Sequence, residues 1–496
     1  MLNKLSIIVF FRKYALLFFA ISSIFIFNGN TGCSSTNEQK IFKKLETQDF
    51  SNDAMLDAYD KFHAFMVKTY AFGHWKSIDW VALNNEIRPQ IVVAENTNDT
   101  DAYITALLKY TRSIPDGHVT WENTILPFLN QFHEGSYGFG IAELDDGRVI
   151  ATTVTTNGPA ARAGIIVGDE ILEWNDVAIT TAAAEKSILW RPNPASIATN
   201  ELKKYEQYRL LTLAPLNTSS RIKFSRPDGS SATTVMLTAE ADGATIQKKT
   251  KFWNKVDDKS PIQHKILPSG YGYILLGTLE SKEISYDQLF TKFKEAMIFL
   301  TANNVPGIIL DLRANSGGSD DLAAQISGFF YSEKTFYEFQ NLYNAYNDQL
   351  QILLPSKDDS YIVGWGIPLN IIPQPPQFTG PVVALVNPDT TSSAEGVAMT
   401  IRNLPKGYVV GLYGTNGSFG MTGGEIEMPY NLQANFPTGQ SLDQFRVIQL
   451  DSKNGIGGIA PTNRVPRTSE NMIKYVKRID VELDFAINFL QSLETK

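Results

Sequence analysis

Two turns rich in glycine and serine, each directly after an apolar run, hold the residues of this sequence that could do chemistry. One run ends in Gly317 and Gly318, and the other leads into Ser392 and Ser393. A buried strand that ends in a glycine turn and feeds a helix presents backbone N–H groups, and a second such unit presents a serine at a helix start. Side by side, the two turns would form an oxyanion hole facing a nucleophile. The pattern therefore indicates acyl-transfer chemistry, with peptide-bond hydrolysis as the favoured reaction.

A serine hydroxyl is a weak nucleophile at its own pKa and needs a base within hydrogen-bond reach. The sequence contains five histidines. Only His118 follows a tight Asp-Gly turn that could aim its ring into a cleft, which makes it the candidate general base.

Each of these residues also has a purely structural explanation. Ser392 could be a helix N-cap, and Ser393 could be the nucleophile in its place. His118 could be a turn residue that bonds its own backbone. Gly317 and Gly318 could serve only a tight turn or close packing of a strand on a helix.

The elements that would hold the two turns alternate between strand-like and helix-like patterns. Strand-like runs occupy residues 271–276, 307–312, 382–386 and 408–411, and helical patterns occupy 286–300, 320–330 and 394–404. Such alternation predicts an α/β domain with a mostly parallel sheet, which we place at residues 242–496. Before it, apolar residues at helical spacing predict a helical segment within residues 34–132, which ends in the turn that holds His118.

Residues 133–241 resemble a PDZ domain. A Gly-Phe-Gly loop at Tyr137, Gly138, Phe139 and Gly140 is followed by short strands and a Gly-Asp-x-Ile-Leu strand, in the order and spacing of that domain. A further strand comes late, which predicts an insertion or an enlarged helix at 181–213. The resemblance implies that the N–H groups of residues 137–140 bind a terminal carboxylate. Otherwise the domain is a rigid spacer or gate.

The first 33 residues are expected to be a signal peptide. Basic residues precede an apolar run at 14–27, which has the length of a signal core and is short for a membrane span. Cys33, the only cysteine, opens a polar stretch and resembles the lipidated first residue of a bacterial lipoprotein, although Asn30 stands where such signals carry an apolar residue. We expect an exported chain with a lipid anchor in a bacterial membrane, on its periplasmic or cell-surface side. Alternatively, Cys33 is incidental to an ordinary signal or an uncleaved anchor.

Composition limits the remaining possibilities. With 496 residues, 43% hydrophobic and 19% charged, the chain is expected to fold into two to four globular domains. A net charge of −8 makes nucleic acid a poor candidate partner. A single cysteine excludes an internal disulfide, and the sequence carries no motif for a metal or another cofactor.

Together, the helical segment ending in Asp-Gly-His, the PDZ insertion, the Asp-Leu-Arg-x-Asn-x-Gly-Gly turn and the Ser-x-x-Glu helix start resemble the tail-specific, or C-terminal-processing, protease and tricorn-core family of serine peptidases. The resemblance implies a ClpP/crotonase-like catalytic domain. It implies that Ser392, three residues before Glu395, is the nucleophile. It also implies that the N–H groups of Ser393 and of Gly317 or Gly318 form the oxyanion hole.

The family has two catalytic versions. In one version, a lysine about two dozen residues after the serine is the base. Here Ser418 occupies that position, and Lys406 lies before the strand that would present a lysine to the site. In the tricorn-like version, a histidine before the PDZ domain is the base, and His118 matches it. A glutamate then orients the histidine; Gly455 stands near its expected position, so Asp451 is the nearest candidate carboxylate. Asp311 and Arg313 are expected to form a structural ion pair, and Glu395 to support the site without donating a proton.

These inferences predict an exported serine endopeptidase that cleaves polypeptides and recognises C-termini through its PDZ domain. The alternative is a catalytically inactive member of the same fold that binds peptides or hydrophobic ligands. A crotonase-type acyl-thioester enzyme would share the paired N–H groups, but the export signal argues against it. The sequence does not predict an oligomeric state.

Overall fold

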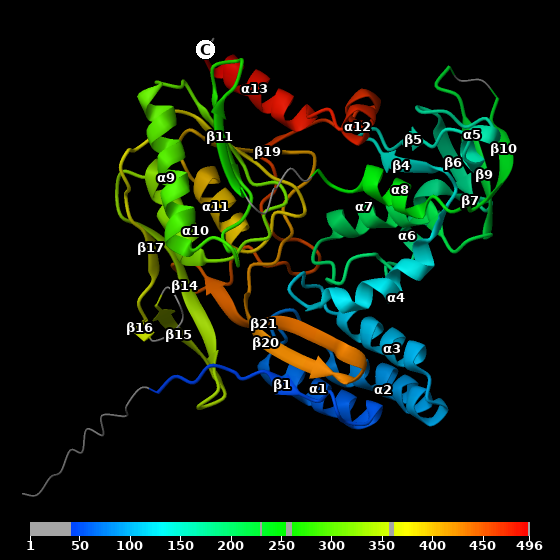
Figure 1. Ribbon diagram of the computed structural model, residues 1–496, viewed down its shortest axis with the longest axis horizontal. Helices are drawn as coiled ribbons and strands as arrows, with labels where there is room; N and C mark the ends of the chain where they lie inside the picture. The colour runs from blue at the N-terminus through cyan, green and yellow to red at the C-terminus, as the bar shows by residue number, and fades with distance from the viewer. Residues whose placement is uncertain (1–40, 229–230, 254–259, 357–361, 495–496) are drawn as a thin grey trace, which may run out of the picture. The chain divides into compact units, whose positions relative to one another are not determined.

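The computed structural model describes residues 41–228, 231–253, 260–356 and 362–494 (Figure 1). Residues 42–496 form one compact unit. In the described ranges, no helix has both the length and the apolar character needed to cross a membrane. The predicted signal peptide and Cys33 lie outside the described residues.

A six-stranded sheet forms the centre of the C-terminal region. Its order is β11 (Ile262–Ile266), β12 (Gly272–Leu276), β13 (Ile308–Asp311), β18 (Val382–Leu385), β19 (Gly407–Gly411) and β22 (Asn463–Arg464). All neighbours pair in parallel except β11, which is antiparallel to β12. The mostly parallel sheet predicted from the α/β alternation is therefore confirmed.

Helices cover both faces of this sheet, which explains why its strands are continuously apolar. Ile308 and Leu310 of β13 join the core under α9 (Tyr286–Ala302), α10 (Asp320–Ser327) and α11 (Ser393–Arg402). Ile309, between them, joins the core under α12 (Ser469–Val476) and α13 (Val481–Glu494). A short 3-10 turn, η3 (Gly328–Phe330), extends α10.

A second, antiparallel sheet was not predicted. Its main strands are β20 (Met421–Met428), β21 (Leu432–Leu442), β14 (Thr335–Asn344), β15 (Gln349–Pro355) and β16 (Ile362–Trp365), with β17 (Leu369–Ile371) on β14 and the turn η4 (Pro429–Asn431) between β20 and β21. Two short strands from the N-terminal region join it: β1 (Gln48–Asp49) pairs with β20, and β2 (Thr120–Trp121) pairs with β21. The N-terminal region is thereby built into a sheet of the C-terminal region.

The predicted helical segment consists of α1 (Met55–Thr69), α2 (Trp80–Thr97) and α3 (Thr100–Arg112), followed by η1 (Asn123–Ile125), α4 (Leu126–Asn130) and η2 (Gln131–His133). Its buried face shares one core with β20 and β21, through residues such as Phe62, Leu107 and Ile426. Because β2 pairs with β21, the turn between α3 and β2 has a defined place beside the C-terminal region. This turn carries His118.

The PDZ-like region contains a sheet of order β10 (Thr233–Thr238), β9 (Ser219–Ser225), β6 (Glu170–Trp174), β5 (Val149–Val154) and β4 (Phe139–Glu143). A further short strand, β7 (Val177–Ala178), pairs with β6. Separately, β3 (Gly135–Ser136) pairs with β8 (Leu213–Ala214). The helices are α5 (Pro159–Arg162), α6 (Ile179–Glu185), α7 (Asn200–Leu211) and, after the last strand, α8 (Gly243–Thr250). The residues predicted to be an insertion or an enlarged helix form the end of α6, an irregular segment and α7.

Candidate active site

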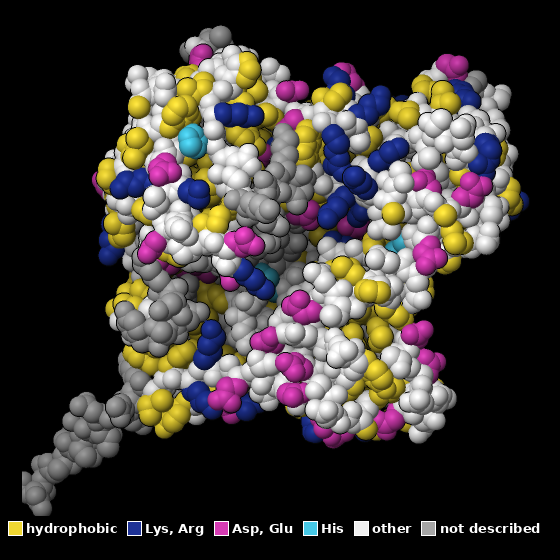
Figure 2. Space-filling model, viewed as in Figure 1, with side chains coloured by type: hydrophobic (Ala, Val, Ile, Leu, Met, Phe, Trp, Pro, Cys, Tyr) yellow, Lys and Arg dark blue, Asp and Glu magenta, His cyan; other side chains and the backbone are white. Residues whose placement is uncertain are grey.

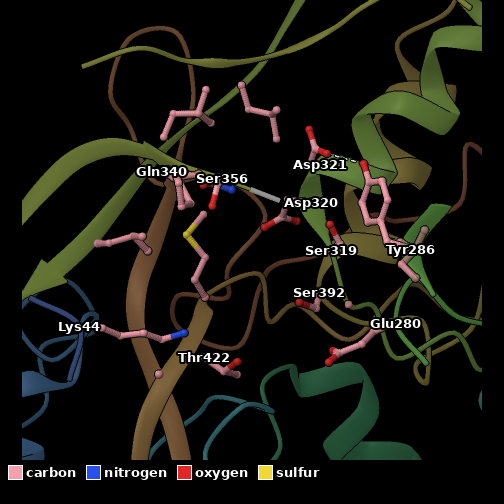
Figure 3. A pocket seen from close by; sticks show the side chains of 18 of the residues that line it. Lys44, Glu280, Tyr286, Ser319, Asp320, Asp321, Gln340, Ser356, Ser392 and Thr422 are labelled. Atoms are coloured by element: carbon pink, nitrogen blue, oxygen red, sulfur yellow. Dashed lines mark hydrogen bonds between the residues drawn. The ribbon is translucent and has the colours of Figure 1, made fainter. Parts of the chain in front are cut away.

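Ser392 stands on a strained turn between β18 and α11. Its backbone angles are φ 58° and ψ −133°, a conformation that costs a non-glycine residue free energy and is therefore typical of functional sites. If Ser392 were an ordinary N-cap, its hydroxyl would accept a hydrogen bond from the N–H of Glu395. This N–H instead donates to the carbonyl oxygen of Ser392 at 2.7 Å. Ser392 is half-buried and lines a cavity of about 880 Å³, together with Ser319 and Glu280 (Figure 3). Its side chain is therefore placed to meet a ligand.

The glycine turn after β13 packs directly against Ser392. A Cβ on Gly317 would lie 2.6 Å from the Ser392 Cβ, so only glycine allows this approach. The N–H of Gly317 donates to Asn315 Oδ1 at 2.9 Å. By contrast, the N–H groups of Gly318 and Ser393 have no acceptor among the described hydrogen bonds, and Ser393 Oγ donates to the Gly318 carbonyl at 3.0 Å. Of the predicted oxyanion residues, Gly318 and Ser393 can supply donors, and Gly317 provides room.

His118 lies in the turn after α3. Its N–H donates to Asp116 Oδ1 at 2.9 Å, and its Nδ1 is buried with no hydrogen-bond partner among the described residues. Burial has the largest effect on the pKa of the His118 ring and lowers it. The negative charge of Asp116 raises this pKa, and the positive charge of Lys76 lowers it further. Because the pKa is lowered, the ring is neutral at neutral pH, as a general base must be.

Ser418 connects the His118 turn to Ser392. Its Oγ accepts the N–H of Gly117 at 2.7 Å, and its carbonyl accepts the N–H of Ser392 at 3.0 Å. Ser418 Oγ also donates to Asn416 Oδ1 at 2.8 Å. The position that carries a lysine in one branch of the family therefore holds a buried hydroxyl that joins the two halves of the site.

Glu395 lies under the site and is fully buried. One carboxylate oxygen accepts from Thr415 Oγ1 at 2.5 Å and the Gly417 N–H at 2.8 Å; the other accepts from the N–H groups of Ser418 at 3.0 Å and Ser392 at 3.1 Å. Burial raises the pKa of this carboxyl to about 8, against the four hydrogen bonds. These contacts are those of a group that supports the nucleophile turn.

Asp451 does not contact the His118 ring in any described hydrogen bond. Its Oδ2 accepts the N–H of Phe419 at 3.0 Å, and its Oδ1 pairs with Lys76 Nζ at 2.6 Å. Burial, and then the nearby Asp116, raise the pKa of Asp451. The structure therefore gives Asp451 a cation as its partner, and not the imidazole that the sequence analysis assigned to it.

Lys76 is the group that sequence reasoning missed. Its Nζ lies between Asp451 and Asp116, 3.5 Å from Asp116 Oδ2, and donates to the Pro115 carbonyl at 2.7 Å. Tyr70 OH also donates to Asp116 Oδ2, at 2.8 Å. The side chain of Lys76 is 1% exposed, so this cluster is a buried support for the His118 turn. No local motif marks this lysine, because its partners come from two distant segments.

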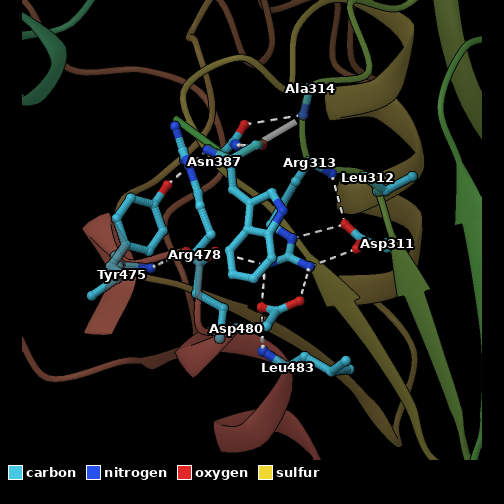
Figure 4. A network of polar contacts seen from close by, with 12 residues as sticks. Asp311, Leu312, Arg313, Ala314, Asn387, Tyr475, Arg478, Asp480 and Leu483 are labelled. Carbon is cyan, nitrogen blue, oxygen red and sulfur yellow. Dashed lines mark hydrogen bonds and ion pairs between the residues drawn. The ribbon is translucent and has the colours of Figure 1, made fainter. Parts of the chain in front are cut away.

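Asp311 and Arg313 form the predicted ion pair, with Nη2 and Oδ2 2.6 Å apart (Figure 4). The same guanidinium pairs with Asp480 at 2.6 Å and Glu482 at 2.9 Å. The pair thus ties the start of the glycine turn to the beginning of α13 and serves structure.

The four residues predicted to bind a terminal carboxylate are buried. Tyr137 is 2% and Phe139 0% exposed. The N–H of Tyr137 donates to the Thr212 carbonyl and that of Gly138 to Ser136 Oγ, at 3.2 and 3.0 Å. A Cβ on Gly140 would lie 2.6 Å from Thr250 Cγ2 of α8. The N–H groups of Tyr137 and Gly138 therefore already have acceptors within the chain, and α8 packs beside Gly140. A pattern local to residues 137–140 contains no information about α8.

Within the described ranges, no group of three or more His, Cys, Asp and Glu side chains could hold a metal ion. The site is made of a serine, a histidine, backbone N–H groups and buried carboxylates.

Comparison with known families matches both main regions. The model of peptidase family S41 matches residues 270–463, and the PDZ domain model matches residues 129–194. Among curated proteins, none matches this sequence.

Two solved structures with TM-scores above 0.5 show the same fold at low identity. Mature CPAF is 15% identical, with a TM-score of 0.57 over 88% of this chain and 98% of that one. Mature CPAF complexed with lactacystin is 13% identical, with a TM-score of 0.56 over 88% and 99%. The tricorn protease is 15% identical, with a TM-score of 0.40 over 89% of this chain and 37% of that one.

Proposed function

Because this chain is a PDZ-containing member of peptidase family S41 and a serine-type peptidase, we propose that it is an exported endopeptidase that works through an acyl-enzyme on Ser392, with His118 as general base. One observation carries the assignment of the nucleophile. Ser392 holds a strained backbone at a cavity wall. The N–H groups of Gly318 and Ser393, in two turns joined by the bond from Ser393 Oγ to the Gly318 carbonyl, have no acceptor among the described residues.

In the proposed reaction, His118 takes the proton of Ser392 Oγ as the oxygen bonds to the peptide carbonyl carbon. The carbonyl oxygen gains negative charge, which the N–H groups of Gly318 and Ser393 stabilise. The carbon–nitrogen bond then breaks, and the imidazolium gives its proton to the leaving amine. A water molecule, deprotonated by His118, hydrolyses the acyl-enzyme and restores Ser392.

A buried, neutral ring and a positioned turn support the role of His118, and Ser418 supplies the connection between the base and the nucleophile. Asp451 is not proposed as the orienting acid, because its contacts are with Lys76 and Phe419. The Asp116 carboxylate, which holds the His118 backbone, is the acidic group that most strongly favours the charged imidazole. We therefore assign the stabilisation of the imidazolium to Asp116, acting through space.

A fluorophosphonate probe tests this proposal on the purified full-length protein. We expect labelling of the wild type and of Ser393→Ala, and none of Ser392→Ala, because the probe forms its bond with an activated serine. His118→Ala should label at a rate lower by about 10² or more. If Ser392→Ala is labelled like the wild type, or the folded wild type is not labelled, the proposed mechanism is wrong and the non-catalytic binding alternative is favoured.

Export and lipid anchoring rest on the sequence alone. We propose that Cys33 is lipidated after removal of the preceding residues and that the anchor holds the enzyme on a bacterial membrane. Cells expressing the full chain with a radiolabelled fatty acid should incorporate label into the wild type and none into Cys33→Ser. Equal incorporation would show that the anchor is elsewhere.

A further inference from the structure

A PDZ domain binds an extended peptide between the edge strand of its sheet and the neighbouring helix. Here β4 is the edge strand, and α7 contacts it. Helix α8 of the same chain contacts β4 as well. Its buried residues Gly243, Ile246 and Thr250 are spaced along one face, so α8 presents a continuous stripe to the PDZ domain.

Thr250 is held from both sides of the groove. On the strand side, Gly140 leaves no room for a Cβ beside Thr250 Cγ2. On the helix side, Arg209 Nε donates to Thr250 Oγ1 at 3.3 Å, and Tyr205 OH donates to the Thr250 carbonyl. The last turn of α8 therefore lies between β4 and α7 beside Gly140. A cavity of about 140 Å³ remains between the two elements farther along β4, with Ile141 and Tyr208 in its lining.

A carboxylate of the chain itself lies beside the predicted carboxylate-binding loop. Asp242, just before α8, accepts from Thr155 Oγ1 at 2.6 Å, and Ser136 Oγ is 3.4 Å away. The N–H of Thr155 donates to the carbonyl of Gly138 at 2.7 Å, which places Asp242 next to the loop. A ligand's terminal carboxylate would meet a like charge here.

The other end of α8 leads into the catalytic domain. The carbonyl of Trp253 accepts from Asn387 Nδ2 at 3.2 Å, and the Trp253 ring lies 5.4 Å from the Arg313 guanidinium (Figure 4). Asn387 Oδ1 accepts the N–H groups of Ala314, at 3.2 Å, and Asp389, at 3.0 Å. One side chain therefore joins the linker to both the glycine turn and the loop that precedes Ser392.

We propose that α8 is the resident ligand of the PDZ groove, and that its docked position holds the two catalytic turns in register through Trp253 and Asn387. Asn387 is then a positioning residue. This groove does not bind substrate C-termini. The PDZ domain instead acts as a clamp, by which we mean that it holds α8, and through α8 the two catalytic turns, in a fixed position. The inference rests on the proposed function for its activity measurements, and it opposes the C-terminal recognition that the sequence predicted.

The first experiment compares cleavage of one peptide with a free and with an amidated C-terminus by the full-length wild type. Lys and Arg side chains gather on the face over α7, α8 and α12 (Figure 2), so about 0.5 M salt is used to screen their attraction for a carboxylate. We expect kcat/KM values within about twofold of each other. A preference of about tenfold or more for the free carboxyl would overturn the inference.

The second experiment undocks α8 with a matched control on the same helix. Ile246 is 0% exposed, whereas the neighbouring Thr245 is exposed. Ile246→Asp should lower kcat by about tenfold to a hundredfold with KM changed little, because a small displacement of catalytic groups costs this much. Thr245→Asp should keep the wild-type kcat. Equal kcat values for the two variants, with both folded by circular dichroism, would contradict the clamp.

A third variant, Asn387→Asp, leaves the PDZ domain unchanged. It tests the same proposal if Ile246→Asp does not fold. Asn387→Asp keeps an oxygen for Ala314 and Asp389 but replaces the donor to Trp253 with a second oxygen. We expect a lower kcat, an unchanged KM and a parallel loss in the rate of fluorophosphonate labelling. Wild-type values in the folded variant would overturn the positioning role of Asn387.

The two proposals fail in different ways. If Ser392→Ala retains activity or labelling, the proposed function fails. If Ser392→Ala is inactive while Ile246→Asp and Asn387→Asp behave as the wild type, the clamp alone fails.

Discussion

The carbonyl oxygen of Ser418 accepts the backbone N–H of Ser392 at 3.0 Å, while the hydroxyl of the same Ser418 holds Gly117 next to His118. His118 and Ser392, the proposed base and nucleophile, come from segments that are far apart in the sequence. This one residue therefore fixes their relative position without taking part in proton transfer.

Ser418→Ala should lower both activity and stability. The change leaves the Gly117 N–H without its acceptor, which costs about 1–3 kcal/mol, and about 1.4 kcal/mol of lost positioning is a tenfold loss in rate. We expect kcat/KM to fall by about tenfold or more, with the melting temperature lowered by a few degrees, in steady-state kinetics and thermal unfolding. A variant with wild-type kcat/KM would show that this contact does not position His118.

The acid limb of the pH profile should lie below the ordinary pKa of histidine. Burial lowers the pKa of His118, and the neutral ring is the active form, so kcat/KM is half-maximal below about pH 6.5. Asp116 raises this pKa, and Asp116→Asn should therefore move the acid limb to still lower pH. A shift to higher pH in Asp116→Asn would contradict the assignment of the limb to His118.

Glu395→Gln should reduce activity although the side chain keeps its size. Each carboxylate oxygen faces a backbone N–H, so the amide NH₂ must oppose a donor in either orientation. We expect a fall in kcat of about tenfold or more and slower fluorophosphonate labelling, because the Ser392 turn loses a defined partner. Unchanged labelling in the folded variant would remove Glu395 from the positioning of Ser392.

The same substitution should change how stability depends on pH. The folded pKa of Glu395 is raised to about 8, above the unfolded value of about 4.3, so between these values the folded state binds more protons than the unfolded state. Stability from this group is present at low pH and is lost as pH rises toward 8. The difference in melting temperature between wild type and Glu395→Gln should therefore decrease from pH 5 to pH 8, and an increase would be inconsistent with a raised pKa.

The parts of the site that sequence predicts are those that a local pattern specifies. The strand-turn-helix units around Gly318 and Ser392 could be recognised because an apolar run, a glycine or serine turn and a helical pattern follow one another in the chain. The pairing of β2 with β21 could not, because two residues of strand carry no signal for a partner about 300 positions later.

The same reason explains why the contacts of Asp451 and the packing of α8 beside residues 137–140 could not be predicted. Asp451 was chosen by its distance from a motif along the chain, but its partner Lys76 belongs to the N-terminal region. Tyr137 to Gly140 match a binding loop residue by residue, but access to that loop depends on α8, which follows the last PDZ strand. In both cases the contacts depend on packing between residues that are far apart in the sequence. No short stretch of the sequence contains the information needed to predict them.

Gly317→Ala tests the contact between the two turns, with Gly147→Ala as its control. Both glycines have positive φ, 95° and 87°, so both substitutions carry a backbone strain of about 1 kcal/mol. A Cβ at Gly147 meets nothing within 4 Å, whereas one at Gly317 would lie 2.6 Å from the Ser392 Cβ and 2.8 Å from the Thr391 carbonyl oxygen. Gly317→Ala must therefore displace the nucleophile turn, and we expect a loss of about 10² or more in kcat/KM, against less than about twofold for Gly147→Ala. Similar activities in the two folded variants would mean that the glycine turn can move away from Ser392, and the oxyanion donors would then have to be sought elsewhere.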